Sequence, residues 1–82
     1  MEYIGRKVAV LKLCMPGNEP DENDKKYTGK ALNRVVEIKH KLDNGFYLTD
    51  FFMPEYIDKK NDYCHYGFLV LDEQNFRLIQ GY

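Results

Sequence analysis

The 82-residue sequence contains no serine and no tryptophan, and it has only two cysteines. Without serine, covalent catalysis would need a cysteine, threonine, lysine or carboxylate nucleophile, so serine chemistry is excluded. Two cysteines, Cys14 and Cys64, are too few for the disulfide framework of a small secreted domain. We expect each to be a small buried apolar residue, with a Cys14–Cys64 bridge as the less favoured alternative.

Long apolar runs are also missing. Even the longest runs, such as residues 8–11, are far shorter than the ~20 residues that span a bilayer, so no membrane segment is expected. Residues 1–6 lack the basic and apolar regions of a secretory signal, and a cytoplasmic protein is the expectation. A chain of this length predicts one domain, residues 1–82.

Motifs for catalysis, metals and phosphates are absent. Cys64 and His65 are neighbours on a predicted strand, where they point to opposite faces, and no zinc-type cysteine pair exists. The six glycines are scattered, so no phosphate-binding loop is present. We therefore expect no enzyme, no catalytic residue, no metal and no cofactor. A small enzyme that uses Cys64 or Cys14 is the alternative.

Residues 35–42 and 46–52 alternate apolar and polar side chains on either side of Asp43-Asn44-Gly45, a turn signal. A three-residue turn would place Leu42 opposite Phe46 and continue the pairing in that register. One face would then meet the core through Val36, Ile38, Leu42, Phe46, Leu48 and Phe52. The other would show Lys39, Lys41, Tyr47, Thr49 and Phe51 to solvent. A bulge beyond the turn would shift the register and turn Asp50 outward.

Residues 28–43 also allow a helix with Thr28 as N-cap and with Ala31, Val35 and Ile38 on one face. The alternative fold is therefore an α+β protein, an antiparallel sheet with one helix at about 28–43. We favour the strand, because β-branched residues pack well on a pleat and because the next run has matching phase.

Further strands are predicted at residues 5–14, 63–71 and 76–79, with a polar loop over residues 16–29. Pro54 is expected to begin a short helical turn, and residues 72–75 are expected to form a tight or 3₁₀ turn. These elements predict a mostly β protein, a five-stranded SH3-like small barrel with a long first loop.

Three segments resemble SH3-like or KOW-type barrels. Residues 4–10 (IGRKVAV) resemble the opening strand, residues 27–30 (YTGK) with 33–38 (NRVVEI) are similar to the KOW turn and strand, and residues 68–79 resemble the last two strands. Asn33 stands where KOW repeats usually have glycine, and asparagine tolerates the left-handed conformation. The resemblance implies the fold and, as an expectation, a binding function.

Aromatic and cationic side chains provide the predicted binding surface, which consists of Lys39, Lys41, Tyr47 and Phe51, joined by Tyr27 and Tyr66. Such a surface suits a protein groove or stacked nucleic-acid bases. The near-neutral net charge of −1 favours a protein partner, which gives a non-enzymatic interaction module. The composition fits an AT-rich coding sequence, so an accessory or inhibitor protein of a phage or mobile element is the expected setting. The alternative is a KOW-like RNA- or DNA-binding module that also uses Arg34.

Overall fold

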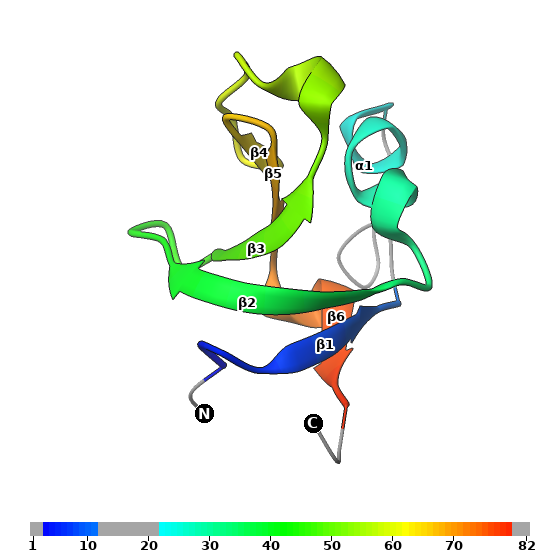
Figure 1. The fold of residues 1–82 in the computed structure, drawn as a ribbon, viewed down its shortest axis with the longest axis vertical. Helices are drawn as coiled ribbons and strands as arrows, with labels where there is room; N and C mark the ends of the chain where they lie inside the picture. Colours follow the sequence, from blue (N-terminus) through cyan, green and yellow to red (C-terminus); the bar gives the residue numbers. More distant parts are fainter. Residues whose placement is uncertain (1–2, 12–21, 80–82) are drawn as a thin grey trace.

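The computed structural model describes residues 3–11 and 22–79. Its strands form one antiparallel sheet in the order β4-β5-β3-β2-β1-β6 (Figure 1). The strands are β1 (Lys7–Val10), β2 (Val35–Lys41), β3 (Tyr47–Phe52), β4 (Cys64–His65), β5 (Phe68–Leu71) and β6 (Phe76–Leu78). The helical elements are α1 (Glu22–Lys26) and three 3₁₀ turns, Thr28–Ala31, Pro54–Tyr56 and Glu73–Asn75. Within the described ranges, no helix has the length and apolar character needed to cross a bilayer.

The mostly β prediction is confirmed, and two details need correction. There are six strands rather than five, because the chain turns at Tyr66 and Gly67, where φ is 49° and 92°. The predicted strand 63–71 is thereby divided into β4 and β5. The barrel is not closed over the described residues, since β4 and β6 lie at opposite ends of the sheet order.

The alternative helix at about 28–43 is wrong. Only Thr28–Ala31 forms a 3₁₀ turn, and β2 begins at Val35. Asn33 adopts φ 67°, the left-handed conformation that asparagine tolerates and that reverses the chain before β2. The polar segment 16–29, predicted as loop, contains α1 in its described part.

A bulge in β2 decides which side chains of β3 face the core. Near the turn the predicted register is confirmed, with Lys41 opposite Tyr47 and the Leu42 amide donating to the Phe46 carbonyl at 2.8 Å. The ladder then shifts, so Ile38 pairs with Thr49 rather than with Asp50. Residues directly opposite each other share a face of the sheet.

The predicted faces of residues 46–52 are therefore reversed. Tyr47 and Thr49 lie on the buried side with Ile38, at 5% and 1% exposure. Leu48 and Phe52 lie on the opposite side, because neighbouring strand residues alternate. We call that opposite side the outer face of the sheet.

The core fills the inner side of the sheet. Tyr47 packs edge-to-face against Tyr3 and Phe76, with ring centroids 5.2 and 5.9 Å apart. The Thr49 hydroxyl donates to the Leu69 carbonyl at 2.8 Å, so this buried polar group has a partner. The buried cluster consists of Val8, Val10, Tyr27, Ala31, Val36, Ile38, Tyr47, Met53, Cys64, Leu69, Leu71 and Phe76.

Residues 72–78 follow the prediction of a turn and a closing strand. Asp72 and Asn75 form a capping box around the turn Glu73–Asn75. The chain then enters β6, which pairs with β1. Burial and the nearby Glu73 carboxylate raise the pKa of Tyr3, which packs against this end of the sheet.

Candidate binding face

Three side chains form a row across the outer face of β4, β5 and β3. His65 lies opposite Phe68, and Phe68 lies opposite Phe52. The rings of Phe52 and Phe68 are 5.0 Å apart, and these side chains remain 42% and 38% exposed. Paired aromatic rings thus face solvent where a sheet would ordinarily carry polar residues.

Ile57 and Tyr66 enlarge this apolar area from the adjoining turns, with 60% and 51% of their surface exposed. Gly67 brings the two turns together, since a Cβ added there would lie 2.6 Å from the Phe52 ring and 3.3 Å from the Ile57 Cα. We call Phe52, Ile57, Tyr66 and Phe68 the outer apolar patch.

An open hollow lies beside this patch. Its volume is about 430 Å³, and it is formed where the hairpin turn meets the loop before β4. The backbone N–H of Asn61 donates to the Cys64 carbonyl at 2.8 Å, and Lys60 and His65 form an isolated antiparallel β-bridge. These backbone contacts fix the loop. The lining residues are Leu42, Asp43, Asn44, Lys60, Asn61, Asp62 and His65.

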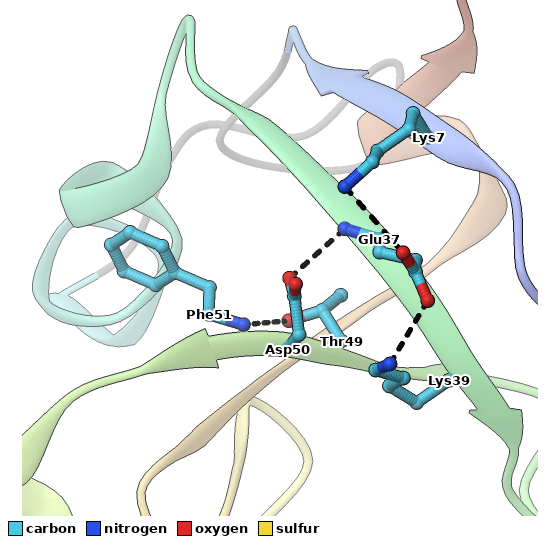
Figure 2. Close-up of polar contacts among 6 residues, drawn as sticks. All are labelled: Lys7, Glu37, Lys39, Thr49, Asp50 and Phe51. Atoms are coloured by element: carbon cyan, nitrogen blue, oxygen red, sulfur yellow. Dashed lines mark hydrogen bonds and ion pairs between the residues drawn. The ribbon is translucent and has the colours of Figure 1, made fainter. Parts of the chain in front are cut away.

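A charged network covers another part of the sheet surface (Figure 2). Lys39 and Lys7 approach the Glu37 carboxylate at 2.9 and 3.5 Å. The hydrogen bond and charge of Lys39, helped by Lys7, lower the pKa of Glu37. The Asp50 carboxylate accepts the Glu37 backbone N–H at 3.0 Å, and this bond satisfies an amide beside the bulge. Asp50 thus faces outward, as the bulged register predicted.

The structure disperses the six residues predicted to bind a partner. Lys39 is paired with Glu37, and the Lys41 ammonium lies 5.7 Å from the centroid of the Tyr47 ring. Tyr47 is buried, which contradicts its predicted exposure, and Phe51 is half-buried against the core. In Figure 2 the Phe51 ring is turned away from the charged network.

Tyr27 is also buried, at 3% exposure. The centroid of its ring lies 4.7 Å from that of Tyr56 and 6.0 Å from that of Tyr63, on which it stacks. Its hydroxyl accepts a hydrogen bond from the side-chain amide of Asn61 at 3.3 Å. Through these contacts Tyr27 packs the α1 region against the connection between β3 and β4. Tyr66 alone among the six predicted residues belongs to the outer apolar patch.

The other patch residues, Phe52, Ile57 and Phe68, were not predicted as contact residues. A signal was present in residues 46–52, where both alternating sets of side chains contain aromatics. Such a strand buries one apolar set and exposes the other unless a second layer covers it. Phe52 belongs to the exposed set.

The structure also places Cys64 and His65, two of the residues considered as a nucleophile or as metal ligands. Cys64 is fully buried, its thiol lies 3.8 Å from the Tyr56 carbonyl, and burial raises its pKa. His65 points to the opposite face, as the strand pattern predicted. Cys14 lies outside the described residues. Within the described ranges, no three His, Cys, Asp or Glu side chains gather as a metal site.

Comparison with known proteins gives no relative: no protein-family model, no curated protein and no solved structure matches the chain. The outer apolar patch and the hollow beside it are therefore the features of the molecule that indicate a function.

Proposed function

We propose that this chain is a non-enzymatic interaction domain that binds another protein through the outer apolar patch. The observation that carries the proposal is the exposure of four large apolar side chains, Phe52, Ile57, Tyr66 and Phe68, on the turns and strands at one end of the sheet. Exposed apolar clusters rimmed by polar residues are typical of protein interaction sites.

The net charge of −1 favours a protein over a nucleic acid as the partner. Lys39 and Lys30 are paired with Glu37 and Glu55 at 2.9 and 2.8 Å, so two exposed ammonium groups are already neutralised. Phosphate binding requires cations that are available to replace counterions. A surface centred on Phe and Ile side chains gains instead from contact with apolar groups of a partner protein.

The patch size indicates the kind of contact. Four large side chains that are roughly half exposed present on the order of 300–400 Å² of surface. A standard protein interface buries about 800 Å² on each partner. The patch is therefore suited to a short segment of a partner rather than to the large interface of an obligate complex.

An affinity capture with matched baits tests the proposal. The proteins captured from lysate of the source cells are compared for three baits: the wild-type chain, the double variant Phe52→Ala/Phe68→Ala, and Val35→Ala. Val35 is a suitable control because it is 51% exposed but lies on β2. We expect a protein that wild type and Val35→Ala retain and the double variant loses, with unchanged circular dichroism for all three baits.

Two results would contradict the proposal. One is the absence of any protein with that capture profile. The other is capture of nucleic acid that is released by salt at about 0.5 M, because counterion release makes such binding weaken as salt is added. That result would support the RNA- or DNA-binding alternative instead.

A further inference from the structure

The hollow and the outer apolar patch form one continuous surface. His65 connects the two, because it lines the hollow and lies opposite Phe68 of the patch across the β4–β5 pair. Its ring contacts Tyr66 edge-to-face at 5.0 Å. A ligand that covers the patch at Phe68 and Tyr66 is therefore next to the hollow.

The hollow carries an excess of negative charge. Its ionisable groups are Asp43, Lys60, Asp62 and His65. Two carboxylates against one ammonium give a net charge of −1 with the histidine neutral. The Lys60 ammonium also lies 5.8 Å from the centroid of the Tyr66 ring, a cation–π contact with a patch residue.

In the part of the chain that the structure describes, the two carboxylates of the hollow form no ion pair. The ion pairs there join Glu37 and Glu55 to lysines instead. The neighbouring amides are occupied, since the Asn44 and Asn61 carbonyl oxygens accept the backbone N–H groups of Phe46 and Tyr63. Among the described groups that line the hollow, the Asp43 and Asp62 carboxylates are the anions that can pair with a basic group of a ligand.

We propose that the ligand is a short peptide segment in which an apolar side chain is accompanied by a lysine or arginine. The apolar side chain covers Phe52 and Phe68, and the basic side chain enters the hollow between Asp43 and Asp62. This inference rests on the proposed function and names the chemistry of the partner segment. Opposite charge at the rim fixes the register of a segment that the apolar contact alone would leave free to slide.

A second copy of the chain fits this surface less well. In a two-fold symmetric dimer the same patch meets itself, so the negative hollow would lie against apolar residues or another negative hollow. Neither arrangement supplies a cation to Asp43 and Asp62.

Selection from a random 12-residue peptide library tests the inference, with the whole chain as the immobilised target. Parallel targets are Asp43→Asn/Asp62→Asn, which removes the charge but keeps the shape, and Phe52→Ala/Phe68→Ala. We expect wild type to enrich peptides that contain an aromatic or large aliphatic residue together with lysine or arginine. A synthetic enriched peptide should bind the Asn variant roughly fivefold more weakly, as for a partly exposed ion pair.

The outcomes separate the two proposals. Apolar peptides without a preference for basic residues, bound equally by the Asn variant, would overturn this inference and leave the interaction patch intact. Peptides bound equally by Phe52→Ala/Phe68→Ala, or no enrichment at all, would overturn the proposed function as well. Sedimentation that shows a dimer dependent on Phe52 would identify a second copy as the occupant and contradict the peptide ligand.

Discussion

At the scale of single residues, Lys39 marks the point where the two strands of the hairpin change register. It is the extra residue in the β2 ladder, between Ile38 and His40, where the register with β3 shifts. A β-bulge places two residues of one strand opposite one of its partner. Because of this, Ile38 keeps its place in the core while His40 turns to the outer face beside Leu48.

The Glu37 carboxylate next to this bulge should make stability depend on pH. Its pKa is lower in the folded chain because Lys39 donates a hydrogen bond to it and both lysines attract it. A lowered folded pKa adds stability above the unfolded pKa, and this stability is lost as pH falls through the folded pKa. We predict that Glu37→Gln lowers the urea midpoint slightly at pH 7 and not at pH 2.5.

Asp58→Asn is the control for that comparison, because Asp58 lies exposed in the turn after Pro54–Tyr56. Its midpoint should follow the wild type at both pH values. A Glu37→Gln deficit that persists unchanged in acid would show that the carboxylate charge is not the cause.

Cys64 should be a slow nucleophile. The thiol is fully buried, and burial raises its pKa, so the thiolate that reacts is scarce at neutral pH. We predict that iodoacetamide alkylates Cys64 at least about tenfold more slowly in the native chain than in 8 M urea. Mass spectrometry of the peptide that contains Cys64 measures both rates, and equal rates would revive the cysteine enzyme alternative.

At the scale of the elements, the turn between β4 and β5 supports the outer apolar patch. Gly67 has φ 92° and an added Cβ would meet the Phe52 ring, whereas Gly45 has φ 89° with nothing within 4 Å. A side chain in the left-handed region costs roughly 1 kcal/mol, and displacing a packed ring adds about 1 kcal/mol more.

The two glycines therefore form a matched pair. We predict that Gly67→Ala lowers the free energy of unfolding by about 2 kcal/mol and Gly45→Ala by about 1 kcal/mol. Urea denaturation followed by circular dichroism measures both losses. Equal losses would mean that Phe52 does not pack on Gly67 as described.

The strand pattern explains why the sheet could be predicted and the orientation of β3 could not. The turn at Asp43-Asn44-Gly45 and the β-branched residues of β2 were sufficient to predict the hairpin. The left-handed conformation of Asn33 agrees with what the resemblance to a KOW turn implied. In β3, however, Tyr47 and Phe52 belong to opposite alternating sets, and both are apolar. A shift of one residue exchanges the faces, and burial of either set stabilises a hairpin.

The separation of β4 from β5 has a clearer signal in the sequence than the orientation of β3. A glycine inside an apparent strand indicates a bulge or a bend, and Gly67 lies in the middle of residues 63–71. The hollow had no such trace, because its two sides come from the hairpin turn and from residues 60–62, which only the tertiary arrangement brings together.

At the scale of the whole molecule, the fold leaves Phe52 of β3 and Phe68 of β5 partly exposed at one end of the outer face, whereas Val70 of β5 is buried. The α1 region is fastened by Tyr27 to Tyr56 and Tyr63. Phe52 and Phe68 therefore remain open to a partner. A small domain of this kind has too little chain to bury every apolar side chain, and the remaining apolar area is available for binding.

Everything proposed for the surface depends on the inward position of Tyr47 and the outward position of Phe52. The free energies of unfolding of Tyr47→Ala and Phe52→Ala, from urea denaturation, test this most directly. We predict a loss of about 3–5 kcal/mol for Tyr47→Ala, as for a buried aromatic, and about 1 kcal/mol for Phe52→Ala. A larger loss for Phe52→Ala than for Tyr47→Ala would reverse the faces of β3 and contradict the binding face.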